Sequence, residues 1–299
     1  MAERVERGVD LVKVMASGGF LTPDSDQLGA QFEVAPLRRM VDAVHAAGRR
    51  IVAHTHSIRG AEVALDAGVD GLEHFTCPAE GGAPAPPELL ERIMAASVTV
   101  DPTPGNVPAL LPPVEAMPPH ILEMLARIGI TDRDEHFAQM ATNSQRLREY
   151  GIRVVSGFDA GAMPAKPHGQ LWRSVGELVR GGWPVDEALA TATSVAADDC
   201  GIEGGRLVAG RLADLLVVAG DLESDVRALG RPVAVWVGGQ EVPPASRPCV
   251  GDPAGRAASP GPVRPAVART GRRGRDAPVT ADRVLLSART DAVVIDARL

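Results

Sequence analysis

The stretch Ile51–His74, IVAHTHSIRGAEVALDAGVDGLEH, contains a strand, a helix and a second strand, and it decides the fold class. An apolar strand is expected over Ile51–His54, a helical pattern follows over Arg59–Ala67, and a strand returns over Val69–Glu73. Gly68 comes directly after the helical pattern, where glycine commonly ends a helix. Two strands joined through a helix favour parallel pairing in one sheet.

The same alternation continues on both sides of this unit. Five strands are expected, near Val12, Val52, Gly71, Val98 and Val154. The expected helices lie over Pro36–Arg49, Arg59–Ala67, Pro87–Ala96, Pro119–Ile128, Asp132–Tyr150, Gly169–Arg180 and Val185–Asp199. Repeated units of this kind predict an α/β protein with a parallel sheet, either doubly wound or a (β/α)₈ barrel. Because a complete barrel has eight strands, five would form only part of one.

The chain divides into three regions. Residues 1–204 hold the strand and helix units, and residues 205–242 are β-rich with glycine at the turns, which predicts a small antiparallel segment. Residues 243–299 are rich in proline and arginine, with seven prolines between 243 and 268. This composition predicts a disordered tail.

Composition sets limits on the class of protein. Of the 299 residues, 45% are hydrophobic and 23% charged, which are ordinary values for a globular chain. No apolar run is long enough to span a membrane and the first residues lack a signal-peptide core, so we expect a soluble, cytoplasmic protein. Three widely spaced cysteines, Cys77, Cys200 and Cys249, argue against a disulfide framework and a cysteine zinc cluster.

The charge distribution is uneven. Ten Arg and five Asp give the segment from Arg247 onward a net +5, so the remainder carries −12 of the chain's net −7. An acidic body offers no electrostatic reason to bind nucleic acid. The sequence is compatible with a homo-oligomer.

Lys13 lies inside an apolar strand, where a buried ammonium is unfavourable unless it is paired or neutralised. Carbamylation by carbon dioxide would convert it into an anion whose two oxygens can bridge two metal ions. The alternatives are a lysine that reaches solvent from the strand end, or one that pairs with Asp10.

Ligand-type side chains also stand at the ends of other expected strands. His54 and His56 alternate onto one face, and such a pair is a moderately specific metal signal, although two hydrogen-bonded histidines would look the same. His74 and Asp159 each end a strand, where either alone could be a capping or loop residue. Together with Lys13 they indicate a shared metal site, because carboxyl ends of parallel strands converge in barrel enzymes.

His168 follows the strand of Asp159 and could reach the same pocket. His45, His120 and His136 are expected on helices or in a loop, as surface or packing residues. The sequence contains no GxGxxG or P-loop phosphate motif and no GxSxG elbow.

These motifs, in this order, resemble the amidohydrolase superfamily, and most of all its imidazolonepropionase-like and Xaa-Pro dipeptidase-like members. The similarity runs over about Val5–Val242, and the segments that carry it are Lys13–Gly19, Val52–Ser57, Gly71–Phe75, Ser156–Gly161, Gly182–Thr193 and Gly205–Val217. The resemblance implies a distorted TIM-like (β/α) barrel, of which this chain would hold strands four to eight, with part of a small β-sandwich.

The resemblance also implies a site and a reaction. Lys13 would be a carboxylated ligand, His54 and His74 further ligands, and Asp159 both a ligand and the catalytic proton shuttle. The cofactor would be one or two divalent metals, usually zinc, while His56 and His168 would line the substrate pocket. The implied reaction is hydrolysis of an amide bond in a small substrate, such as a dipeptide or a cyclic amide, by metal-activated water.

Two departures from the family pattern are visible. Nothing before Lys13 supplies the metal-binding HxH or HxD pair of the family's first strand, so we expect an N-terminally truncated chain. Phe158 stands where family members usually have threonine. The alternatives are therefore an inactive remnant or a binding or assembly subunit. A lactonase or phosphotriesterase-like hydrolase would use the same ligands.

Overall fold

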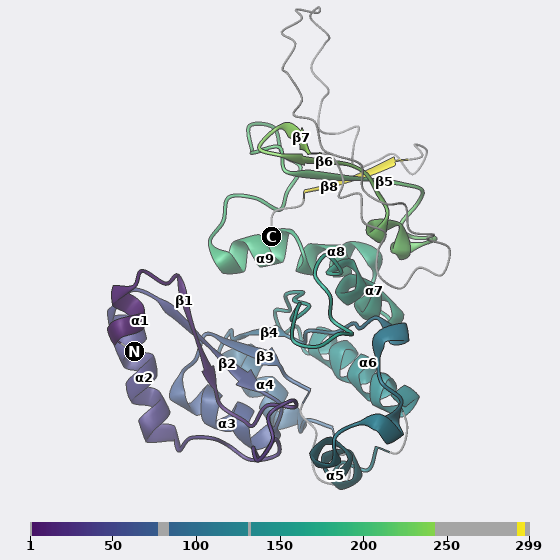
Figure 1. Cartoon of the computed structure of the whole chain (residues 1–299). Coiled ribbons are helices and arrows are strands. Elements are labelled where there is room, and N and C mark those ends of the chain that lie inside the picture. Colours follow the sequence, from purple (N-terminus) through teal and green to yellow (C-terminus); the bar gives the residue numbers. More distant parts are fainter. Residues whose placement is uncertain (1, 77–83, 131–132, 243–291, 297–299) are drawn as a thin grey trace, which may run out of the picture.

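A computed structural model of the chain describes residues 2–76, 84–130, 133–242 and 292–296. Figure 1 shows a parallel sheet flanked by helices and a second sheet at one end of the molecule. The first sheet has the order β1-β2-β3-β4 and the second the order β7-β6-β5-β8. The predicted α/β class with a parallel sheet is therefore confirmed.

The strands of the parallel sheet are neighbours in the order in which they occur along the chain. They are β1 (Leu11–Met15), β2 (Arg50–Thr55), β3 (Gly71–His74) and β4 (Thr99–Asp101). These are four of the five expected strands. The fifth is reduced to one parallel bridge between Val100 and Val154, flanked by backbone hydrogen bonds.

The helices follow the expected pattern with shifted ends. They are α1 (Ala2–Glu6), α2 (Val34–Ala46), α3 (Ile58–Ala67), α4 (Pro87–Ala95), α5 (Pro119–Arg127), α6 (Arg133–Glu149), α7 (Trp172–Arg180), α8 (Val185–Thr191) and α9 (Ser194–Cys200). The helix expected over Val185–Asp199 is in fact two, because Thr193 has φ −130° and ψ −94° and interrupts it. The short helix α1 was not expected.

Helices α2, α3 and α4 cover one face of the parallel sheet, as Figure 1 shows. Fully buried side chains such as Leu37, Val63 and Ile93 pack there against strand residues such as Ile51. Side chains of β1 alternate between buried and exposed, so Leu11, Lys13 and Met15 face away from these helices. The core therefore lies between one face of the sheet and these helices, and the exposed side chains of β1 lie on the opposite face.

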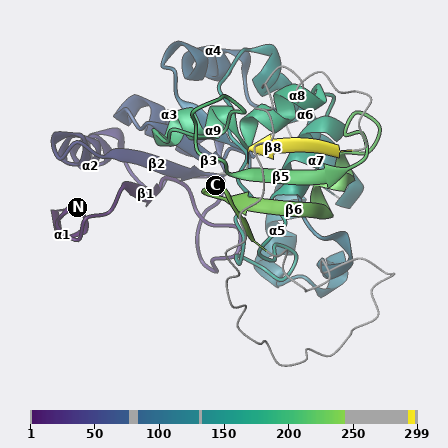
Figure 2. The same cartoon turned by 90° about the horizontal axis from the view of Figure 1, so that it is seen from above.

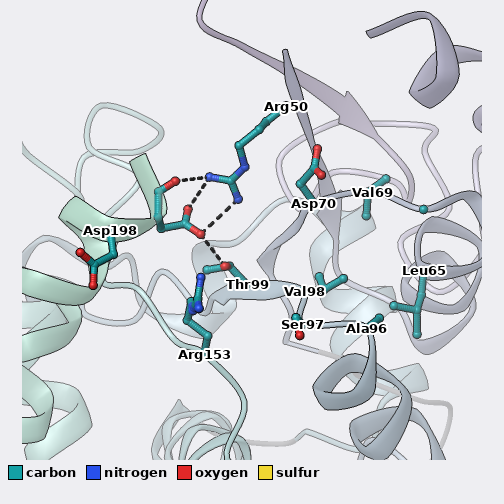
Figure 3. A pocket seen from close by; sticks show the side chains of 12 residues that line it. Arg50, Leu65, Val69, Asp70, Ala96, Ser97, Val98, Thr99, Arg153 and Asp198 are labelled. Carbon is teal, nitrogen blue, oxygen red and sulfur yellow. Dashed lines mark hydrogen bonds and ion pairs between the residues drawn. The ribbon is translucent and has the colours of Figure 1, made fainter. Parts of the chain in front are cut away.

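Helix α9 is fastened to the amino ends of β2 and β4. Arg50 donates to both carboxylate oxygens of Asp199, at 2.9 and 3.1 Å, and Thr99 donates to the same carboxylate at 2.5 Å. Figure 3 shows Arg50 and Thr99 at this hollow of about 420 Å³. The polar groups are satisfied within the chain, so this contact joins helix to sheet.

The second sheet contains β5 (Leu215–Ala219), β6 (Pro232–Val237), β7 (Gln240–Val242) and β8 (Ala292–Asp296), all antiparallel. The prediction of a small antiparallel segment is confirmed. Strand β8, which Figure 2 shows beside β5, lies in the tail that was predicted to be disordered. That prediction is wrong for these five residues, because an apolar run there pairs with β5 over its whole length. The remainder of 243–299 lies outside the described residues.

Within the described ranges, no helix combines the length and the apolar composition that crossing a membrane requires.

Candidate metal centre

Three imidazoles meet at the carboxyl end of the parallel sheet. One nitrogen each from His54, His56 and His74 lies within 4.8 Å of the others. The ring centroid of His54 lies 4.5 Å from that of His56 and 4.5 Å from that of His74. The rings of His56 and His74 are stacked, with their centroids 4.9 Å apart. The strand-end histidines therefore form one cluster.

Local backbone geometry explains how the three rings meet. His54 is in β2, and His56, two residues later, points to the same side just before Ser57, the residue that caps α3. His74 ends β3 after Glu73, and alternation alone would turn these two side chains to opposite faces. A φ of 70° at His74 breaks the strand geometry there, and its ring joins the other two.

Each ring has a polar neighbour at one nitrogen. Nδ1 of His74 lies 2.8 Å from the Thr103 hydroxyl, Nδ1 of His56 lies 3.0 Å from the Thr76 hydroxyl, and Nε2 of His54 lies 3.4 Å from the Gly18 carbonyl. Such partners fix ring orientation and tautomer in metal sites.

The environment holds these imidazoles in the neutral form. Burial, followed by the charges of the neighbouring histidines, lowers the pKa of His74 to about 2 and that of His56 to about 3. Burial also lowers the pKa of His54. Neutral imidazole is the form that ligates metal ions, so the cluster needs no deprotonation near neutral pH.

Lys13 and Asp159 line the same cavity as the three histidines. The charge of Lys13 contributes to the lowered pKa of each imidazole, and that of Asp159 raises the pKa of His54. The Lys13 ammonium lies 3.6 Å from a carboxylate oxygen of Glu73. All four residues predicted as ligands, together with His56, therefore face one space.

His168 differs from this group. It is exposed, next to Gly161, and it is absent from the described residues that line the cavity. A role for His168 in binding substrate stays a prediction.

Several polar residues of the site were passed over in the sequence. Glu73 pairs with Lys13, and burial raises the pKa of its carboxyl. Asp101 ends β4, and burial, followed by the charge of Glu73, raises its pKa to about 7. Asp101 ends an expected strand just as Asp159 does, so the same argument could have found it.

The cavity beside the imidazoles has a volume of about 1010 Å³. Much of its wall is apolar, with contributions from Phe20, Met117 and Met163 and from Ile121 and Leu125 of α5. A polar cluster at one wall of an apolar hollow is the common form of a small-molecule site.

A parallel sheet with neutral imidazoles, a lysine and carboxylates around one cavity at its carboxyl end defines an α/β protein with a candidate metal centre. The chain belongs to the amidohydrolase family, whose pattern matches residues 1–242.

Solved structures and curated sequences agree with this membership. A Xaa-Pro dipeptidase with bound methionine has a TM-score of 0.68 and 24% identity, with 81% of this chain and 56% of that chain covered. A proposed prolidase from Bifidobacterium longum has a TM-score of 0.65 and 30% identity, with 81% and 57% covered. Ochratoxinase from Aspergillus niger is 36% identical over 73 residues, which is 24% of this chain and 15% of that protein.

The chain thus spans little more than half the length of the two solved chains.

Proposed function

We propose that this chain carries the metal centre of a hydrolase that cleaves an amide C–N bond of a small substrate. The observation that carries the proposal is the convergence of His54, His56 and His74 at one wall of the cavity. Membership of the amidohydrolase family supports it.

The residues present suit a divalent metal. Neutral imidazole nitrogens favour zinc and other late first-row ions, and zinc is the ion that the family resemblance implies. His54 and His74 would hold the ion with Asp159. Lys13 would join them once carboxylated. Its side chain is 41% exposed, so carbon dioxide can reach it, but the ion pair with Glu73 stabilises the ammonium and opposes the reaction.

When bound, the metal would lower the pKa of a water molecule and polarise the carbonyl group to be attacked. Asp159 would take the proton from that water and return it to the leaving nitrogen. The neutral histidines would keep their Nδ1 or Nε2 contacts with Thr76, Thr103 and Gly18 and so hold their rings in place.

The cavity wall supports a particular kind of substrate. Aliphatic and methionine side chains of Ile121, Leu125 and Met163 would bury an apolar group. A dipeptide or a cyclic amide with an apolar substituent could place that substituent against the apolar wall and its amide group at the metal centre. Similarity to a Xaa-Pro dipeptidase and to an ochratoxinase supports this class of substrate.

We also propose that the parallel sheet is strands four to eight of a distorted (β/α)₈ barrel. Support comes from the neighbour order of β1 to β4, from the parallel bridge to Val154, and from the packing of α2, α3 and α4 on one face of the sheet. The polar residues then face the barrel interior.

A second candidate is a binding or assembly subunit that needs another chain. The exposure of Leu11 and Met15, 45% and 43%, on the cavity face of β1 favours this alternative, because apolar side chains at a sheet edge favour pairing with further protein.

Metal analysis separates the two candidates. We expect the purified chain to hold close to one equivalent of zinc or more, and His54→Ala to lose it. His45→Ala is the matched control, because His45 is half-exposed on α2 and pairs with Asp70, away from the cluster. A metal-free wild-type chain that cleaves no dipeptide or N-acyl amide would favour the binding subunit.

A further inference from the structure

Lys166 is one of two lysines in the chain, and its ammonium group hydrogen-bonds to backbone carbonyls of the protein. Its ammonium donates to the carbonyl oxygens of Thr103 and Gly105, both at 2.9 Å, and to that of Phe158 at 3.1 Å. It also lies 4.9 Å from the centre of the Phe158 ring. A lysine has three N–H donors, so none remains for the carboxylate of a substrate.

The three carbonyls belong to two loops at the carboxyl end of the sheet. Thr103 and Gly105 follow β4, and Phe158 lies in the loop that carries Asp159. A second contact joins the same loops, because Oδ1 of Asp101 accepts from the amides of Thr103 and Gly157 at 2.8 and 2.9 Å. The Lys166 ammonium and the Asp101 carboxyl group therefore hold the two loops together at neighbouring points.

Each loop delivers one group to the candidate metal centre. Thr103 presents its hydroxyl to Nδ1 of His74 at 2.8 Å. Phe158, whose carbonyl Lys166 binds, directly precedes Asp159. Thr103 and Asp159 have φ values of 41° and 55°, in the left-handed region that is unfavourable for residues with a side chain. Such a conformation persists only where surrounding contacts impose it, and Lys166 and Asp101 both supply such contacts to the two loops.

We propose that Lys166 is a positioning residue of this site. By fixing the carbonyls of Thr103 and Phe158 to one point, it orients the His74 ring through the Thr103 hydroxyl and places the carboxylate of Asp159. With Nδ1 of His74 engaged by Thr103, Nε2 is left for a ligand. The consequence for metal affinity rests on the proposed function, whereas the orientation of His74 does not.

The test compares Lys166→Met, which keeps length and loses every donor, with Lys166→Gln, which keeps two donors. Arg92→Met is the matched control, since Arg92 makes an exposed ion pair with Asp66 on the far side of the sheet. Two quantities are measured on the full chain. The first is the imidazole ¹⁵N chemical shifts of His74 in the metal-free protein, assigned with His74→Gln. The second is the Kd and visible spectrum of Co²⁺.

In the wild type and in Arg92→Met we expect His74 to be a single tautomer. Lys166→Met should show mixed tautomers and bind Co²⁺ about tenfold more weakly with an altered spectrum, because loss of an outer partner typically weakens a metal site by ten to a hundredfold. Lys166→Gln should show a smaller change of the same kind, and it decides the outcome if Lys166→Met does not fold.

Unchanged His74 shifts in the folded variants would overturn the proposal, and so would unchanged Co²⁺ affinity when the wild type binds Co²⁺. A wild type that binds no Co²⁺ would instead refute the proposed metal centre, and the His74 shifts would still decide the role of Lys166.

Discussion

Replacing Gly157 with alanine should strongly lower the free energy of unfolding, because the added methyl group would collide with Asp101. A Cβ atom at this position would lie 1.9 Å from Oδ2 and 2.8 Å from Cγ of Asp101, well inside contact distance. The Asp101 carboxyl is buried and linked to two backbone amides, so it cannot turn aside without losing both.

The size of the effect follows from those two bonds. At pH 8, above the Asp101 pKa of about 7, each bond to the charged carboxylate contributes about 1.5–3 kcal/mol, so loss of both should lower the free energy of unfolding by roughly 3–6 kcal/mol. This is a large part of the roughly 5–15 kcal/mol that a folded domain typically has. The measurement is urea unfolding of the metal-free chain, followed by tryptophan fluorescence.

Gly176→Ala is the matched control. A Cβ at Gly176, within α7, would lie 3.8 Å from a methyl carbon of Val226, which is an ordinary contact. Alanine in a helix is favoured over glycine by roughly 0.5–1 kcal/mol, so this variant should be slightly more stable than wild type.

A double variant tests the mechanism. In Asp101→Ala the obstructing carboxyl is gone, so adding Gly157→Ala should cost little more, and the two substitutions should be strongly non-additive. If Gly157→Ala unfolds at the wild-type urea concentration, or if the two substitutions simply add, the contact between Asp101 and Gly157 does not have the role assigned to it.

Two further outcomes are expected. The pKa values of His56 and His74 in the folded chain lie below the ordinary value, so below about pH 6.5 the unfolded chain binds more protons and the free energy of unfolding falls as pH falls. Asp101 has a raised pKa of about 7, so between about pH 4 and 7 it acts in the opposite direction and partly offsets this loss. The net loss should be about 1 kcal/mol per pH unit between pH 6 and 5 in urea unfolding of the metal-free chain, and a flat profile would contradict it. Arg50→Met should lower the free energy of unfolding by about 1–3 kcal/mol, because it leaves the largely buried Asp199 without its bidentate partner, and an unchanged urea midpoint would show that α9 is held by other contacts.

Much of the fold could be predicted from the sequence because apolar periodicity reports burial directly. The strands near Val12, Val52, Gly71 and Val98 were all identified in this way. The strand near Val154 was overestimated, because an apolar run shows that residues are buried and does not show how many of them pair with a neighbour.

The helix ends and the C-terminal strand were harder to predict for different reasons. The helical pattern is interrupted at Thr193, whose φ of −130° and ψ of −94° are not helical, and the side-chain pattern does not report these backbone angles. Strand β8 depends on pairing with β5, more than 70 residues earlier in the chain, and no local pattern encodes such a contact.

The candidate site was only partly predictable. Strand-end position brought Lys13, His54, His74 and Asp159 together, because parallel strands place their carboxyl ends at one edge. It did not show that the His74 ring stacks beside that of His56, because this depends on a positive φ at His74. Lys166 was missed because its partners are backbone carbonyls, which leave no mark in the sequence.

The convergence of three uncharged imidazoles has a consequence for how the protein should be purified. Nickel binds nitrogen ligands more tightly than iron or cobalt does, and a nickel-affinity column would present it in large excess to the cluster of His54, His56 and His74. Protein prepared on such a resin would contain nickel taken from the resin. The resident ion should therefore be identified in protein purified by ion exchange.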